Sequence, residues 1–155
     1  MAELREALAA EGFPEVKTYI LSGNVILKSA QDRESIQSLV HNVILDKIGA
    51  DITVIARTHD EIKDLFENNP FPIETSKRTY FTLFETMPEE DLIEEFIKLA
   101  KSPDEIVINQ DSLYILFATK YSDSKFNNNF IERKLNIAAT TRNFNTISRL
   151  LELSE

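Results

Sequence analysis

Two arginines stand at the ends of predicted strands, each directly before a residue that suits the start of a helix. A guanidinium group beside the exposed N–H groups of a helix start can bind a phosphate or a carboxylate. The second corner adds hydroxyl and amide donors from its neighbours. The candidate anion-binding residues are Arg57 and Thr58 at the first corner, and Thr140, Thr141, Arg142 and Asn143 at the second.

A structural interpretation of the same residues stays open. Each arginine could pair with a nearby acid, and Thr58 and Asn143 could simply cap a helix. The chain has 26 acidic residues against 17 basic ones, so partners for an arginine are abundant. This balance favours the structural interpretation over the anion site.

A tight turn at Ser22, Gly23 and Asn24 is a second candidate for a functional segment. Glycine and asparagine both tolerate a positive φ, which the short turns of β-hairpins require. A serine nucleophile on a sharp turn would need flanking glycines and a histidine base, and Gly23 stands alone. We therefore interpret these residues as a hairpin turn rather than a functional turn.

Residue types that hold metals and cofactors are scarce. His41 and His59 are the only histidines, and neither has a second metal ligand four residues further on. The chain has no cysteine, and its three glycines are too widely separated to form a phosphate-binding loop or a dinucleotide fingerprint. We expect no metal and no cofactor.

The acidic composition restricts the partners. A formal net charge of −9 opposes a large nucleic-acid footprint, which needs clustered lysine and arginine, and it opposes adsorption to an anionic membrane. No apolar run approaches the ~20 residues of a membrane span, and residues 1–12 lack the apolar core of a signal peptide. We expect a cytoplasmic protein with no membrane partner, and nucleic acid is disfavoured.

The second half of the chain predicts strand, helix, strand, strand, helix, strand and a final helix. Apolar and β-branched runs place its strands at 79–85, 105–109, 113–118 and 138–142. This order is typical of the split βαβ, or ferredoxin-like, arrangement. The aromatic residues on these strands are expected to pack in the core.

The first half shows the same order without the opening strand. Its elements are a helix at 2–11, strands at 16–21 and 25–29, a helix at 33–48, a strand at 52–56 and a helix from about residue 59. Residues 52–66 align with 137–151 when Arg57 is matched to Arg142. We predict an α+β fold of two ferredoxin-like units with antiparallel sheets, divided into domains 1–72 and 73–155, with the first unit missing its N-terminal strand.

The missing strand has a consequence for assembly. The first strand of this arrangement lies inside the sheet, so its absence would leave backbone hydrogen-bonding groups open. A second copy of the chain could pair with that open edge. A homodimer through the sheet edge is therefore one expectation.

Two segments carry a resemblance to a known family. MAELREALAAEGFPEVKTYILSGNVIL and TTRNFNTISRLLEL resemble the signatures of an uncharacterised bacterial family, domain-of-unknown-function family 1697. Members usually have a strand and a glycine-rich run upstream of the first segment, and a tryptophan where this chain has Phe144. The resemblance implies a tandem ferredoxin-like fold and an additional strand before Met1 in relatives. It implies no activity.

The expected function is a non-catalytic binding or interaction module for a small anionic ligand at the arginine corners. One alternative is an enzyme that acts on a small phosphorylated metabolite between the two units. The other alternative is a weak nucleic-acid binder, which the negative net charge disfavours.

Overall fold

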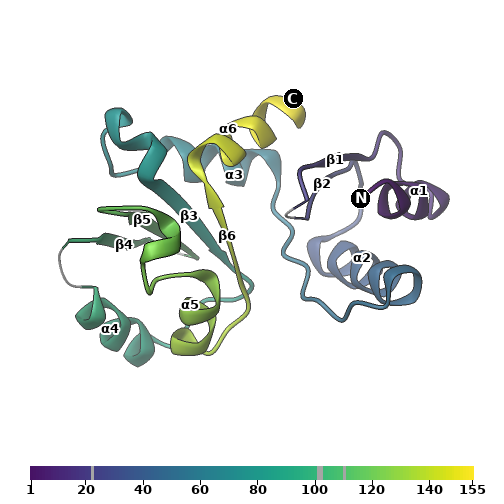
Figure 1. The fold of residues 1–155 in the computed structure, drawn as a ribbon. Helices are drawn as coiled ribbons and strands as arrows, with labels where there is room; N and C mark the ends of the chain where they lie inside the picture. The colour runs from purple at the N-terminus through teal and green to yellow at the C-terminus, as the bar shows by residue number, and fades with distance from the viewer. Residues whose placement is uncertain (22, 101–102, 110) are drawn as a thin grey trace. The chain divides into compact units, whose positions relative to one another are not determined.

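The computed structural model describes residues 1–21, 23–100, 103–109 and 111–155 (Figure 1). Within these ranges, helices combine with a two-stranded and a four-stranded sheet, and all neighbouring strands are antiparallel. The predicted α+β class is confirmed. Contacts divide the chain into unit 1, residues 1–60 with 149–155, and unit 2, residues 61–148. None of the described helices is long and apolar enough to cross a membrane.

Unit 2 is organised around a strand with neighbours on both edges. Its elements in chain order are β3 (Thr79–Phe84), α4 (Glu90–Leu99), β4 (Glu105–Asn109), β5 (Ser112–Leu116), α5 (Asn128–Leu135) and β6 (Ala139–Asn143). The strands lie in the order β4-β5-β3-β6, so β3 pairs with both β5 and β6. This succession of elements is the one that the sequence predicts for this part of the chain.

One face of this sheet packs against α4 and α5 (Figure 1). Side chains of a strand alternate between the two faces of a sheet, and Phe84 of β3 and Ile115 of β5 point to this side. They meet Phe96 of α4 and Ile131 of α5, and these four side chains are at most 1% exposed. Burial of large apolar side chains stabilises this side of unit 2.

The other face of the sheet is covered by α3 (His59–Glu67) and by the start of α6 (Phe144–Leu153). Phe81 of β3 lies 6.2 Å from Phe66 of α3 and 6.3 Å from Phe144 of α6, measured between ring centroids. The hydroxyl of Tyr114 on β5 donates a hydrogen bond to the Leu65 carbonyl at 3.2 Å. Both faces of β5 are therefore covered, which explains why all five of its residues are buried.

Unit 1 packs two helices against a short hairpin. Its elements are α1 (Ala2–Ala10), β1 (Lys17–Tyr19), β2 (Asn24–Ile26) and α2 (Arg33–Ile48). Leu4 and Leu8 of α1 meet Val40, Val43 and Ile44 of α2 in the core. Helix α2 begins at an Asp32 side chain that accepts from the Ser35 N–H, and it ends at Gly49, whose φ of 74° is left-handed.

The predicted strand at residues 52–56 is wrong: the segment is not assigned to any sheet. The aligned residues in unit 2 are 137–141, and the last three of them belong to β6, which is a strand because it pairs with β3 over five residues. In unit 1 no described strand stands in the position of β3, so the β-branched segment has nothing to pair with. Side chains of α2 bond to it instead: Gln37 Oε1 accepts from the Ala56 N–H, and the His41 ring lies 2.7 Å from the Ile52 carbonyl oxygen.

The units defined by contacts differ from a simple cut of the chain. Most of α3 belongs to unit 2, whereas the end of α6 belongs to unit 1, where Lys17 Nζ donates to the Leu153 carbonyl at 3.0 Å. The expected domains, 1–72 and 73–155, were drawn from the repeat in the sequence, whereas the two units are defined by contacts between residues. That division stays a prediction.

We predict that Tyr114→Phe lowers the free energy of unfolding by about 1 kcal/mol, because it removes the hydrogen bond to Leu65 and leaves a buried carbonyl without its donor. Urea denaturation measures the change. Tyr19→Phe, on the hairpin of unit 1, is the matched control and should leave the midpoint unchanged. Equal midpoints for Tyr114→Phe and the parent chain would show that this hydrogen bond does not hold α3 on the sheet.

We also predict that stability falls as the pH rises above about 10, the ordinary pKa of tyrosine. Burial raises the pKa of Tyr114, with Asp111 adding to the shift, and burial likewise raises the pKa of Tyr80. The unfolded chain therefore loses these protons at a lower pH than the folded chain does, and ionisation favours unfolding. Thermal unfolding between pH 9 and 11 should show a steeper decline for the parent than for Tyr80→Phe/Tyr114→Phe.

Candidate functional site

The second arginine corner lies on the edge strand β6. Arg142 Nη1 donates to the Thr141 carbonyl at 2.9 Å and to the Thr140 hydroxyl. Burial lowers the pKa of Arg142, and Tyr121 acts in the opposite direction. An arginine pKa starts so high that the guanidinium remains a cation at neutral pH. The corner therefore contains a half-buried, positively charged guanidinium that bonds to residues of its own strand.

The neighbours of Arg142 have structural roles. The Thr141 hydroxyl donates to Asn128 Oδ1 at 2.9 Å and lies 2.8 Å from the Thr82 hydroxyl. Asn143 Oδ1 accepts from the Thr146 N–H at 2.8 Å and so caps α6. Asn143 therefore caps α6, and Thr141 bonds to side chains of β3 and α5.

The first corner repeats one detail of the second. Arg57 Nη1 donates to the Ala56 carbonyl at 2.9 Å, the same bond to the preceding residue that Arg142 makes. Thr58 is exposed. Arg57 belongs to unit 1 and Arg142 to unit 2, so each corner has to be considered as a site of its own unit.

The candidate turn is part of the unit 1 hairpin. Gly23 has a φ of 82°, which only glycine adopts at low cost. Asn24 begins β2, and its Nδ2 donates to the Tyr19 carbonyl at 3.1 Å. Ser22, the third residue of this candidate, lies outside the described residues. Gly23 and Asn24 shape the turn, as the hairpin interpretation predicts.

A pocket that the sequence did not predict lies at the beginning of β3. We call it the tyrosine pocket; it has a volume of about 470 Å³ and is lined by Lys77, Arg78, Tyr80, Thr119, Lys120, Tyr121 and Asp123. The rings of Tyr80 and Tyr121 stack with centroids 4.9 Å apart and planes at 15°. Three basic side chains and one acidic side chain line the pocket, so its local charge is opposite to that of the whole chain.

Strand pairing assembles the tyrosine pocket from two distant segments. Thr79 is the register partner of Leu116, so the residues just before β3 lie beside those just after β5. Arg78 Nη1 donates to the Phe117 carbonyl at 2.8 Å, which fastens the two segments together across 39 residues of sequence. In the sequence, the available signals were the pair Lys77-Arg78 before β3 and the pair Lys120-Tyr121 after β5. These two pairs line one pocket only because β3 pairs with β5.

The pairing of β3 with β6 places the tyrosine pocket and the second corner at the same end of the unit 2 sheet. Tyr80 is the register partner of Asn143, and Phe81 is the partner of Arg142. The Tyr121 hydroxyl accepts from the Asn128 N–H at 3.1 Å, and Asn128 Nδ2 donates to the Ala139 carbonyl of β6. A basic, aromatic pocket and a half-buried guanidinium therefore share one end of the unit 2 sheet.

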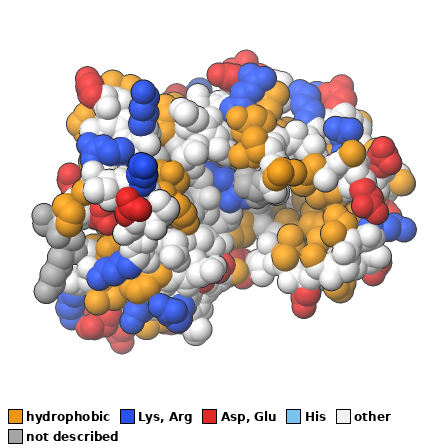
Figure 2. All heavy atoms as spheres, in the orientation of Figure 1, with side chains coloured by type: hydrophobic (Ala, Val, Ile, Leu, Met, Phe, Trp, Pro, Cys, Tyr) orange, Lys and Arg blue, Asp and Glu red, His pale blue; other side chains and the backbone are white. Residues whose placement is uncertain are grey.

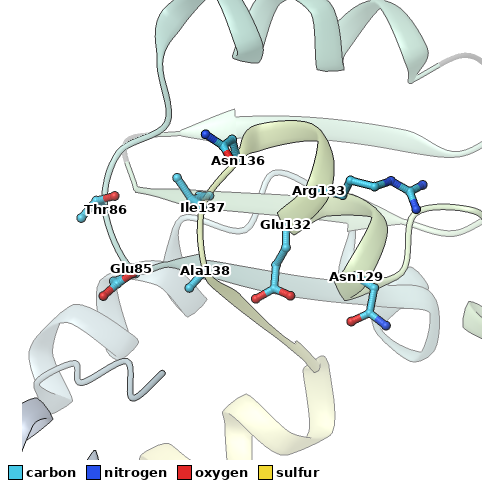
Figure 3. A pocket seen from close by; sticks show the side chains of 8 residues that line it. All are labelled: Glu85, Thr86, Asn129, Glu132, Arg133, Asn136, Ile137 and Ala138. Atoms are coloured by element: carbon cyan, nitrogen blue, oxygen red, sulfur yellow. The ribbon is translucent and has the colours of Figure 1, made fainter. Parts of the chain in front are cut away.

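A second hollow in unit 2 has a different character (Figure 3). It has a volume of about 560 Å³ and is lined by Glu85, Thr86, Asn129, Glu132, Arg133, Asn136, Ile137 and Ala138. Glu132 Oε1 accepts from the Ala139 N–H at 2.8 Å, and in Figure 3 the Arg133 side chain extends away from that carboxylate. Two carboxylates make this hollow a poor place for an anion. Among the described residues, no group of three acidic or histidine side chains is arranged to hold a metal ion.

We predict that Asn143→Ala lowers the free energy of unfolding by about 1 kcal/mol, because α6 loses the side chain that caps it. Chemical denaturation followed by far-ultraviolet circular dichroism measures this. Asn143→Ser keeps a capping oxygen and should recover most of the loss. If both variants unfold like the parent, Asn143 does not act as a cap in solution.

Comparison with known proteins gives the family and the fold. No curated protein sequence matches the chain. The solved structure described as that of the conserved bacterial protein SP0830 from Streptococcus pneumoniae superimposes with a TM-score of 0.76 at 17% sequence identity, covering 100% of this chain and 88% of that one. At this identity the likeness concerns the fold alone. A family model described as a protein of unknown function, DUF1697, matches residues 1–114, so the chain belongs to the DUF1697 family.

Proposed function

We propose that this protein is a non-catalytic binding module for a small anionic ligand, and that the ligand binds in the tyrosine pocket beside the Arg142 corner. The observation that carries the proposal is the gathering of Lys77, Arg78 and Lys120 around one pocket in a chain of net charge −9. Packing of the core does not account for this reversal of local charge, because Lys77 and Lys120 are exposed.

Electrostatics support a small ligand rather than a polymer. Two unit charges 4 Å apart attract by about 1 kcal/mol in water and by a few times more near a protein surface, and salt screens charges beyond about 10 Å. The pocket cations therefore act on a ligand that enters the pocket, whereas a long polyanion would also meet the acidic remainder of the surface. On the face shown in Figure 2, acidic and basic side chains are intermingled and form no continuous basic area.

The polar groups of the pocket suit an oxyanion. Ammonium groups on Lys77 and Lys120 would contact phosphate or carboxylate oxygens as point charges. Burial and the neighbouring Tyr121 raise the pKa of Tyr80, so its hydroxyl keeps its proton and stays a hydrogen-bond donor at neutral and mildly alkaline pH. Lysine cations and a protonated phenol suit the binding of an oxyanion, which is why we favour a binding module.

We also infer that the two units are copies of one ferredoxin-like plan. Both arginines donate to the carbonyl of the preceding residue, and both precede a helix, α3 or α6. Unit 2 has the strand order of that plan, with the first strand inside the sheet.

We predict that Lys77→Ala/Lys120→Ala weakens the binding of pyrophosphate about tenfold at low salt. The estimate assumes a loss of about 0.7 kcal/mol for each exposed charge contact. Isothermal titration calorimetry at two salt concentrations measures the affinity and its dependence on screening.

The matched control is Lys98→Ala/Lys125→Ala, which changes the net charge equally at lysines outside the tyrosine pocket. It should bind pyrophosphate nearly as tightly as the parent. Equal losses in both double variants would mean that only the overall charge matters. No measurable binding by the parent chain would reject the anion-binding function.

A further inference from the structure

The tyrosine pocket presents an aromatic surface to a ligand as well as positive charge. Tyr80 belongs to β3, and Tyr121 begins a short 3₁₀ helix, Tyr121–Asp123. Both rings are only partly buried and both line the pocket, so part of the stacked pair faces the space inside it. An inorganic anion gains little from such a surface, whereas a ligand with an apolar ring would remove it from water.

The tyrosine pair is fixed in place by its surroundings. Phe117, which is fully buried, packs against both rings at steep angles, with its centroid 5.1 Å from that of Tyr80 and 5.5 Å from that of Tyr121. The Tyr121 hydroxyl is held by the Asn128 N–H at 3.1 Å. A surface that is ordered before the ligand arrives lowers the entropy cost of binding against it.

The size of the pocket also favours a ligand larger than an inorganic anion. Its volume is about 470 Å³, and pockets for small organic ligands typically measure about 300–1,000 Å³. A water molecule takes about 30 Å³ in the liquid, so the pocket has room for on the order of fifteen water molecules. A phosphate group displaces only some of them. An organic ligand with one phosphate would displace more and would also cover the rings.

The charged side chains indicate how many anionic groups the ligand carries. Arg78 already donates to the Phe117 carbonyl at 2.8 Å, so part of its guanidinium is used within the fold. Lys77 and Lys120 are exposed and are the remaining cations of the pocket. A phosphate monoester carries a charge of about −1.5 to −2 at pH 7, which two ammonium groups match. The Asp123 carboxylate would repel a further phosphate, but it can accept a hydrogen bond from an N–H or O–H group of an organic ligand.

We propose that the ligand of the tyrosine pocket is a free nucleoside monophosphate, that is, a small phosphate monoester with a planar aromatic base. The base packs against the pair Tyr80 and Tyr121, and Lys77 and Lys120 contact the phosphate. Asp123 accepts from a hydroxyl or amino group of the ligand. Stacking on an aromatic side chain tolerates any base, so the pocket selects this class of ligand and not one base. The inference rests on the proposed function, because it specifies the anion that binds at the same site.

The end of a nucleic-acid strand carries the same chemistry and is the rival ligand. The further phosphates of a strand would extend from the pocket over a chain of net charge −9. Repulsion between like charges counts against such a ligand, and proteins that bind strands supply clustered lysine and arginine along the backbone. A free nucleotide places its single phosphate within the pocket and avoids this repulsion.

The first experiment compares ligands on the unmodified chain. Isothermal titration calorimetry at low salt measures the affinities of adenosine monophosphate, ribose 5-phosphate, which lacks the base, and adenosine, which lacks the phosphate. We expect adenosine monophosphate to bind about tenfold more tightly than ribose 5-phosphate, because the base stacks on the rings. It should also bind more tightly than adenosine, because the lysines contact the phosphate. Nuclear magnetic resonance should show the base protons shifted upfield by the tyrosine rings.

The second experiment compares two variants that both lack the Tyr80 hydroxyl. Tyr80→Phe keeps the ring and should keep the preference for adenosine monophosphate over ribose 5-phosphate. Tyr80→Leu loses the ring and should reduce that preference to about threefold or less, with the affinity for ribose 5-phosphate equal in the two variants. Tyr19→Leu makes the same exchange on the hairpin of unit 1, outside the pocket, and should leave all affinities unchanged.

The outcomes separate this inference from the proposed function. Equal affinities for adenosine monophosphate and ribose 5-phosphate would overturn the aromatic part and leave anion binding intact. Equal affinities for adenosine monophosphate and adenosine would overturn the role of the phosphate. No binding of pyrophosphate, ribose 5-phosphate or adenosine monophosphate would reject the anion-binding function itself. Tighter binding of a 5′-phosphorylated tetranucleotide than of the mononucleotide would replace the free nucleotide with the end of a strand.

Discussion

Backbone hydrogen bonding on both edges of β3 is the interaction on which unit 2 depends. A buried strand must find partners for its N–H and C=O groups, and β3 finds them in β5 and β6. With those partners in place, its side chains alternate between two apolar layers: Phe84 faces α4 and α5, and Phe81 faces α3 and α6. The same pairing brings the residues before β3 beside those after β5, which forms the tyrosine pocket.

Unit 1 shows the effect of lacking that interaction. Residues 52–56 have a β-branched sequence like that of a buried strand, yet they remain outside any sheet. Side chains of α2 form hydrogen bonds with backbone groups at the two ends of the segment, because polar backbone groups near a core still need partners. The core of unit 1 rests on packing between α1 and α2, where Leu8 is fully buried.

The distribution of charge over the chain favours anion binding in a pocket over binding across a broad surface. The chain has a net charge of −9, and ion pairs such as Lys28 with Glu15 and Lys98 with Glu95 are exposed and contribute little to stability. The tyrosine pocket differs because its cations converge beside stacked rings. Arg142, whose guanidinium bonds back to its own strand, lies at the same end of the sheet because β6 pairs with β3.

The sequence by itself determined the local elements and the class of fold. Helix α2 has the predicted limits, because Asp32 caps its start and Gly49 ends it, and α6 begins after Asn143 as its capping pattern indicates. Only the tertiary structure decided whether a β-prone segment became a strand, and which distant basic residues met. Propensity and capping act within a few residues, whereas the pairing of β6 and the joining of Arg78 to Phe117 depend on partners far along the chain. Residues 52–56 have the propensity without the partner, and Lys77 and Lys120 form one site only because β3 pairs with β5.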